Sequence, residues 1–378
     1  MTRLRRGAVM LVVLAVGAQL GLSACDGSKK KPTATKSTAP QVGLVVTPPA
    51  GNSGVPVSTE IGTKVTDGKI TDISLTDATG QRVAGEFRAD GAAWVPATTL
   101  RYDTAYTTKV TAVGKDNKPV THEAKFTTMA KPKGQAVTSE LMLTNGGTYG
   151  VGMPIVVEFG SDVPEQSRAA VQQRLFVKID PPQPGAWRWF GGKQVMYRPE
   201  KYWQPGTKIT ARKALDGVQI GDRYADEDSS ATVTIGRKLT IDINNATKQL
   251  SVYQNDALVR TMPVSLGKAS TPTSSGNTVI MSREASTVFR TPEYTTPVQY
   301  AMRLTWGGQY IHAAPWSVGD QGRRNVSHGC TNVSTDNARW LYEQTLVGDP
   351  VTTRNTEVGL DAGDGWTAWD IPWEQYKA

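Results

Sequence analysis

Three observations predict a mainly β protein: two β-sandwich domains, then a β-rich domain with one main helix and a Trp-rich C-terminal extension. Short segments that alternate apolar and polar residues lie between turn residues along most of the chain. The pattern of the first region recurs roughly 100 residues further on. The composition excludes a wholly disordered chain, because 38% of the 378 residues are hydrophobic and 37 Gly and 22 Pro supply many turns. This length also predicts two or three domains.

Residues 1–24 resemble a lipoprotein signal peptide. Arg3, Arg5 and Arg6 precede an uncharged, mostly apolar run, and Leu22-Ser23-Ala24-Cys25 is similar to the lipobox of bacterial lipoproteins. The resemblance implies cleavage before Cys25 and lipidation of its sulfur. We therefore expect an exported protein, held by this lipid on the outer face of the cytoplasmic membrane and facing the cell wall. The alternative is an uncleaved membrane helix, for which the apolar run is short.

Residues 25–41 predict a flexible tether, because Lys, Pro, Ser and Thr dominate the segment and leave little to bury. Its lysines could also contact anionic lipid headgroups. Removal of the three arginines of the signal segment lowers the net charge from +8 to +5. This small excess, without a long basic run in the folded part, argues against nucleic acid as a partner.

Residues 42–130 predict the first β sandwich and residues 137–236 the second, since Met153-Pro154 matches Val55-Pro56 and residues 205–210 match residues 103–108. Each module looks like an immunoglobulin-like domain. Such a module acts as a spacer, which we favour, or binds a ligand. An acidic cluster in the second module indicates a solvated loop or, alternatively, a cation site with oxygen ligands. It consists of Asp222, Asp226, Glu227 and Asp228.

Residues 237–354 predict a third, mostly β domain with one convincing helix. Ser334 is a good N-cap, Asp336 favours the first turn, and Gly348 lies at the exit. One face of this helix would carry Ala338, Leu341, Tyr342 and Thr345. Residues 355–378 form an extension with Trp366, Trp369 and Trp373. We expect this extension to pack on the third domain; gripping glycan strands is the alternative.

The third domain contains a candidate nucleophile. The chain has two cysteines, and if Cys25 carries lipid, Cys330 is an unpaired thiol in an exported protein. Two of the three histidines, His312 and His328, lie within 18 residues of it. The third, His122, lies in the first module and is predicted to be a surface residue. A nearby imidazole or helix N-terminus lowers the pKa of a thiol. Gly329 allows a tight turn whose amides could face an oxyanion. The alternative is a structural cysteine beside two incidental histidines.

Several segments together resemble the signature of L,D-transpeptidases with the YkuD fold, especially the actinobacterial type with immunoglobulin-like domains before the catalytic domain. They are Tyr310-Ile311-His312, Ala313–Gly319 and Ser327-His328-Gly329-Cys330-Thr331-Asn332, with further similarity from about Val42 to the C-terminus. The resemblance implies a peptidoglycan transpeptidase that forms 3→3 cross-links between stem tetrapeptides through a Cys330 thioester, with release of D-Ala and without a cofactor. It also implies inhibition by carbapenem-type β-lactams.

The resemblance assigns roles to individual residues. Cys330 would be the nucleophile and His312 its base, while His328, Gly329 and the Cys330 amide would form the oxyanion site beside Ser327. Asn332 would orient the loop or the substrate. The positions expected to line the substrate cleft are Tyr294, Gly307, Gly308, Trp316 and Asn332. Arg323 and Arg324 either meet a stem carboxylate or lie in a solvated loop.

One position departs from the pattern of some relatives, in which a catalytic Ser follows the base histidine. Here the residue is Ala313, so a backbone carbonyl or another group must orient the His312 ring. Two other classes of function remain open. One is a zinc hydrolase with His312, His328 and Cys330 as ligands; the other is a non-catalytic lipoprotein that binds the cell wall.

Overall fold

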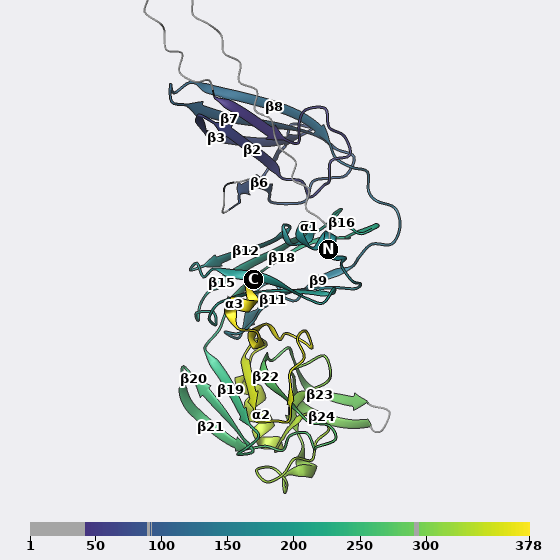
Figure 1. Ribbon diagram of the computed structural model, residues 1–378, viewed down its shortest axis with the longest axis vertical. Helices are drawn as coiled ribbons and strands as arrows, with labels where there is room; N and C mark the ends of the chain where they lie inside the picture. Colours follow the sequence, from purple (N-terminus) through teal and green to yellow (C-terminus); the bar gives the residue numbers. More distant parts are fainter. Residues whose placement is uncertain (1–41, 89–90, 92, 291–294) are drawn as a thin grey trace, which may run out of the picture. The chain divides into compact units, whose positions relative to one another are not determined.

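The computed structural model describes residues 42–88, 91, 93–290 and 295–378 (Figure 1). The predicted signal peptide and tether, with Cys25, lie outside the described residues, as does Tyr294. The described chain is mainly β, as predicted, with three α-helices. None of its helices is both long and apolar enough to cross a membrane.

The first module consists of two four-stranded sheets around one core. One sheet has the order β1 (Gly43–Thr47), β2 (Ile61–Thr66), β6 (Ala93–Pro96), β5 (Gly85–Phe87). The other has the order β4 (Arg82–Val83), β3 (Gly68–Asp77), β7 (Ala105–Gly114), β8 (Pro119–Thr127). Inward-facing residues such as Ile61, Leu75 and Val110 are fully buried between the sheets. This arrangement is the expected β sandwich.

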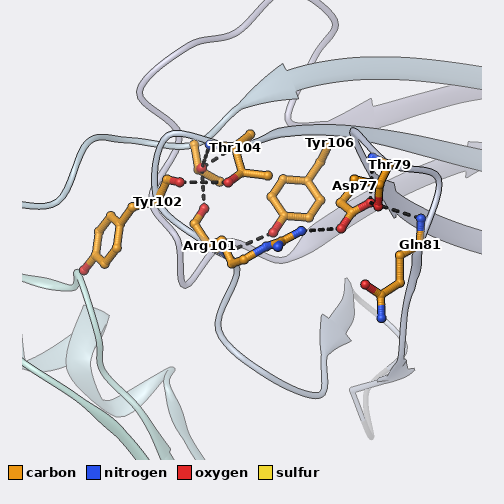
Figure 2. A network of polar contacts seen from close by, with 8 residues as sticks. Asp77, Thr79, Gln81, Arg101, Tyr102, Thr104 and Tyr106 are labelled. Atoms are coloured by element: carbon orange, nitrogen blue, oxygen red, sulfur yellow. Dashed lines mark hydrogen bonds and ion pairs between the residues drawn. The ribbon is translucent and has the colours of Figure 1, made fainter.

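A polar network closes one end of this sandwich (Figure 2). The Asp77 carboxylate accepts hydrogen bonds from the backbone N–H groups of Thr79 at 2.9 Å and Gln81 at 3.0 Å, and forms an ion pair with Arg101. The Tyr106 hydroxyl accepts the N–H of Arg101 at 3.0 Å. The hydrogen bond from the Thr79 hydroxyl is the main reason why the pKa of Asp77 is lowered. The loop before β7 is thereby fixed to the turn after β3.

The second module repeats the first. One sheet has the order β13 (Gly185–Phe190), β14 (Gln194–Pro199), β11 (Ile155–Phe159), β9 (Ser139–Leu141). The other has the order β10 (Thr148–Tyr149), β18 (Asp228–Ile235), β15 (Lys208–Ala214), β12 (Leu175–Asp180). The pairing β9-β11-β14-β13 reproduces β1-β2-β6-β5, and β12-β15-β18 reproduces β3-β7-β8. The shared order confirms the predicted repeat. The module also contains α1 (Glu165–Gln172) and a small hairpin of β16 (Gln219–Ile220) and β17 (Arg223–Tyr224).

Cations of the chain already pair with two members of the acidic cluster. Asp228 forms an ion pair with Arg212 at 2.7 Å, and Glu227 forms one with the buried Lys213 at 2.6 Å. In the part of the chain that the structure describes, no group of three His, Cys, Asp or Glu side chains is arranged to hold a metal ion. Two of the four carboxylates therefore serve to neutralise buried or half-buried cations.

The third domain packs two sheets around a separate core. The larger sheet has the order β21 (Ala257–Pro263), β20 (Gln249–Gln254), β19 (Leu239–Asn244), β27 (Pro350–Arg354), β22 (Ser274–Val279), β28 (Val358–Gly359). The smaller has the order β23 (Ser282–Arg290), β24 (Thr295–Arg303), β25 (Tyr310–Ala313), β26 (Thr331–Val333). Helix α2 (Thr335–Gln344) follows β26 and contacts β24 and β25. Ser334 caps it by accepting the N–H of Asn337, as predicted. Thr345, expected on the helix, is already extended and forms the C-cap.

The extension packs on the third domain, as predicted, and also on the second module. It contains a 3-10 turn, η2 (Ala368–Asp370), and a short helix, α3 (Trp373–Tyr376). The Trp369 indole donates to Gly152 O at 2.6 Å and the Tyr376 hydroxyl donates to Met196 O at 2.7 Å. Both acceptors belong to the second module, whereas Asp370 Oδ1 accepts the N–H of Asn277 in the third domain at 2.8 Å. The predicted packing on the third domain is therefore found, together with packing on the second module. The reason is that residues of both domains share one core with Trp366.

Candidate active site

Strand pairing brings His312 and Cys330 to one place. Strand β25 runs parallel to β26 with His312 opposite Asn332, and Cys330 directly precedes β26. Both side chains line a cavity of about 530 Å³ in the third domain. His328, Ser327, Asn332 and Trp316 line the same cavity. The structure therefore assembles most of the predicted site residues around one hollow.

The Cys330 thiol is buried and has a raised pKa. Its exposed fraction is 9%, and its Sγ donates to Gly308 O with an S···O distance of 3.5 Å. Burial raises the pKa of the thiol to about 11, and a backbone hydrogen bond from Tyr310 only partly opposes this. From sequence, a nearby imidazole and the N-terminus of the following helix were expected to lower this pKa; that expectation was wrong, because desolvation raises it. Burial therefore favours the neutral thiol over the thiolate.

The His312 ring is oriented by the residue that departs from the family pattern. Its Nδ1 lies 2.9 Å from the backbone carbonyl oxygen of Ala313. Because a carbonyl only accepts, Nδ1 carries the proton and Nε2 remains available as a base. Burial lowers the pKa of His312, and the Ala313 hydrogen bond opposes that shift. Phe289 meets the ring edge-on with centroids 5.2 Å apart. The imidazole is therefore neutral and held, without a serine hydroxyl.

The loop from Ser327 to Cys330 is closed by its own first side chain. The Ser327 hydroxyl donates to Cys330 O at 2.6 Å and accepts the Gly329 N–H at 3.1 Å. Gly329 has a φ of +117°, a conformation that favours glycine. The exposed His328 has its Nε2 3.3 Å from the Lys268 ammonium, which can only donate. The proton of a neutral His328 ring is therefore on Nδ1.

A second loop supports the first from behind. The buried Thr273 hydroxyl donates to Gly329 O at 2.9 Å and accepts the Gly267 N–H at 2.8 Å. The Thr271 hydroxyl and the Lys268 N–H both donate to Ser327 O, at 3.2 Å and 2.9 Å. No role was predicted for these residues from the sequence. They hold the backbone of the two residues Ser327 and Gly329, which precede the candidate nucleophile.

Asn332 has one satisfied and one unsatisfied end. Its amide Nδ2 donates to Ser317 Oγ at 3.1 Å, whereas Oδ1 is buried with no hydrogen-bond partner among the described residues. The side chain is 2% exposed and lines the cavity. A buried carbonyl without a donor favours a ligand N–H. Ser317 was not singled out from sequence, although it lies within the Ala313–Gly319 segment.

Of the other described residues predicted for the cleft, Trp316 lines the cavity, whereas Gly307 and Gly308 are not among its lining residues. Trp316, in the 3-10 turn η1 (Pro315–Ser317), is 58% exposed, with its ring centroid 6.1 Å from that of His312. The Gly307 N–H donates to Asp364 Oδ1, and Gly308 O accepts the thiol hydrogen. Arg323 and Arg324 are exposed, and Arg324 forms an ion pair with Asp320. Phe289 and Asp364 carry no motif in the sequence that could have identified them.

Fold and site together define a β-rich domain with a buried thiol and a neutral imidazole in one cavity, preceded by two sandwiches. Residues 52–219 match a bacterial Ig domain model and residues 238–352 match an L,D-transpeptidase catalytic domain model. L,D-transpeptidase 2 of Mycobacterium tuberculosis is 32% identical over 400 residues, covering 100% of this chain and 96% of that protein. The chain belongs to the L,D-transpeptidase family.

The chain has two further similarities. L,D-transpeptidase 5 of M. tuberculosis is 32% identical and is matched over 98% of this chain and 84% of its own length. A solved structure of an LD transpeptidase in complex with imipenem is 33% identical, covers 58% of this chain and 99% of its own, and has a TM-score of 0.48. The family assignment rests on the sequence matches.

Proposed function

We propose that this chain is a peptidoglycan L,D-transpeptidase that forms 3→3 cross-links between stem tetrapeptides through a thioester on Cys330. The observation that carries the proposal is the pair of Cys330 and His312 in one cavity, with His312 Nδ1 bonded to Ala313 O and Nε2 left as the base. Membership of the L,D-transpeptidase family supports the same reaction class.

In the first half-reaction Nε2 of His312 takes the thiol proton while Sγ attacks the carbonyl carbon of the diamino acid at position three of a donor stem. The tetrahedral intermediate collapses, the bond to the terminal D-Ala breaks, and the imidazolium gives its proton to the departing amine. Because the thiol pKa of about 11 leaves little free thiolate, proton removal accompanies attack.

In the second half-reaction the side-chain amine of an acceptor stem attacks the thioester carbonyl. Nε2 removes a proton from this amine and returns one to Sγ as the C–S bond breaks, so an amide forms and the thiol is restored. We propose that the Cys330 N–H and His328 face the oxyanion in both steps. The Gly329 N–H can donate to the oxyanion only if it gives up its hydrogen bond to the Ser327 hydroxyl.

Mass spectrometry tests this function. The chain is incubated with a purified disaccharide-tetrapeptide, beside the Cys330→Ala variant and a chelator control. The expected product is a dimer that has lost one D-Ala, absent with the variant and unaffected by chelator. Tripeptide alone would indicate a carboxypeptidase, loss of activity with chelator a zinc hydrolase, and no product a wall-binding protein.

The same thiol supports a proposal about inhibition. Carbapenem-type β-lactams should acylate Cys330, because attack by the activated sulfur opens their strained ring. A stable mass increase equal to one carbapenem, mapped to the peptide containing Cys330 and missing in Cys330→Ala, is the expected result. An adduct that persists in the variant would contradict it.

We also propose that a lipid on Cys25 anchors the enzyme to the outer face of the cytoplasmic membrane. The motif Leu22-Ser23-Ala24-Cys25 supports this placement. Cells that express the chain and are labelled with a palmitate analogue should incorporate it into the membrane-bound protein. The Cys25→Ala variant should be unlabelled; retention of the label would refute the anchor.

A further inference from the structure

A short loop, Trp306–Gly308, separates the thiol from the C-terminal extension and is bonded to both. The carbonyl oxygen of Gly308 accepts the thiol hydrogen of Cys330 at 3.5 Å. One residue earlier, the Gly307 N–H donates to Asp364 Oδ1 at 2.6 Å. An N–H to a carboxylate at this distance is a charge-assisted hydrogen bond. Two consecutive residues therefore connect an acidic side chain of the extension with the nucleophile.

The loop sequence is suited to this connection. A Cβ at Gly307 would lie only 2.8 Å from Asp364 Oδ2, so glycine allows the carboxylate its close approach. Gly308 has a φ of +94°, which an L side chain rarely adopts. The base of the loop is held independently, since the Gly308 N–H donates to Thr305 O and the Gln309 N–H donates to Thr305 Oγ1. Asp364 bonds the outer part of the loop.

The backbone that carries Asp364 is itself anchored. Gly365 has a φ of +91°, and a Cβ there would lie 2.6 Å from Met281 Sδ. Trp366 is 2% exposed, and its indole N–H lies 3.3 Å from Glu158 Oε1 of the second module. The carboxylate is thus presented from a turn with little freedom to move.

We propose that Asp364 is a positioning residue for acyl transfer, because its hydrogen bond to the Gly307 N–H holds the Gly308 carbonyl over the Cys330 thiol. The inference rests on the proposed role of Cys330 as nucleophile. In the resting state this hydrogen bond keeps Cys330 Sγ in place, and the S–H bond turns from the carbonyl to His312 Nε2 when the proton is transferred. Small displacements of a reacting group cost large factors in rate. The extension then contributes to the active site as well as to packing.

The test compares Asp364→Ala, Asp364→Asn and the matched control Asp361→Ala, whose side chain is exposed in the same extension. Two readouts are measured on the full chain: kcat and KM for transfer from disaccharide-tetrapeptide, and alkylation of Cys330 by iodoacetamide, resolved from Cys25 by peptide mapping. Asp364→Ala should lower kcat about tenfold with KM changed less than about twofold. It should also speed alkylation, since the carbonyl no longer covers Sγ.

Asp364→Asn keeps an acceptor oxygen and should restore most of the rate, while Asp361→Ala should match the wild type. Wild-type kcat and alkylation in Asp364→Ala would overturn the inference. The inference would also be overturned if Asp364→Ala lost activity, Asp364→Asn did not restore it, and both variants had a lower thermal unfolding midpoint that accounts for the loss. If the wild type transfers no acyl group, the proposed function fails, whereas alkylation still reports whether Asp364 holds the loop.

Discussion

At the scale of single residues, burial controls the chemistry more than proximity does. Cys330 and His312 line the same cavity, and desolvation raises the pKa of the thiol to about 11 and lowers that of the imidazole. For both groups, the charged form loses more free energy through desolvation than it gains from interactions with neighbouring residues. The resting pair is therefore thiol and imidazole, and the proton must move when the substrate is bound.

This state predicts a characteristic pH dependence. The transfer rate should fall only as pH drops through the lowered pKa of His312, below 6.5, because protonated imidazole cannot act as a base. Alkylation of Cys330 should rise about tenfold per pH unit between pH 7 and 9, since the thiolate fraction grows until its pKa. Iodoacetamide kinetics measure this. A flat profile across that range would indicate a preformed thiolate–imidazolium pair.

Ala313 offers a second test at this scale. Because the backbone carbonyl of residue 313 holds His312 Nδ1, the side chain there is not needed for orientation. Ala313→Ser should therefore change kcat/KM by less than about threefold, or roughly 0.7 kcal/mol. Steady-state kinetics on the variant check this. A large gain in activity would show that the missing hydroxyl limits this enzyme.

At the scale of elements, the conformation of the loop from Ser327 to Cys330 depends on hydrogen bonds from the segment Gly267–Thr273. The segment Gly267–Thr273 bonds the backbone of Ser327 and Gly329 through two threonine hydroxyls and one amide. Thr273 is the central member, since it is 2% exposed and serves both as donor and as acceptor. Without it, a buried carbonyl and a buried N–H lose their partners.

We expect Thr273→Val, which keeps the shape but removes the hydroxyl, to destabilise the protein by about 2 kcal/mol. It should also slow acyl transfer, because the Gly329 carbonyl is no longer held. Urea denaturation and steady-state kinetics measure the two effects. Thr273→Ser retains the hydrogen bonds and is the control; equal losses in both variants would assign the effect to the missing methyl.

At the scale of the whole molecule, the extension joins the second module to the catalytic domain. Arg198 of the second module is 2% exposed and lies among the extension's rings, 4.6 Å from Trp369 and 4.2 Å from Tyr376. Its guanidinium donates to Ala368 O at 3.0 Å and Ile371 O at 2.6 Å. Burial of this cation lowers its pKa, but the carbonyls and ring faces satisfy its charge.

Arg198→Ala should therefore lower the free energy of unfolding by about 3 kcal/mol, as both hydrogen bonds and stacking are lost. Thermal unfolding and proteolysis of the extension measure the change. Arg168, which stacks on Trp189 at 5.3 Å and is half-buried, is the matched control. Arg168→Ala should lower the free energy of unfolding by less than about 1 kcal/mol. Equal losses in the Arg198 and Arg168 variants would show that the burial of Arg198 adds no stability.

The sequence by itself determined the fold class and the repeat, and it predicted Cys330 and His312 as nucleophile and base. These predictions rest on local patterns, which can be read from the sequence without the fold. The patterns are the alternating strands, the Ser334 cap and the His312 and Cys330 motifs. The repeat followed from matching turns and is confirmed by the shared order of seven strands in the two modules, which differ in the eighth.

Only the tertiary structure decided the rest. The raised thiol pKa, the carbonyl that orients His312, the Asp364 contact and the packing of the extension on Arg198 all depend on burial or on residues far apart in sequence. Arg198 and Ala368 are separated by 170 positions. Desolvation and such distant hydrogen bonds exist only once the chain has folded, so no local pattern encodes them.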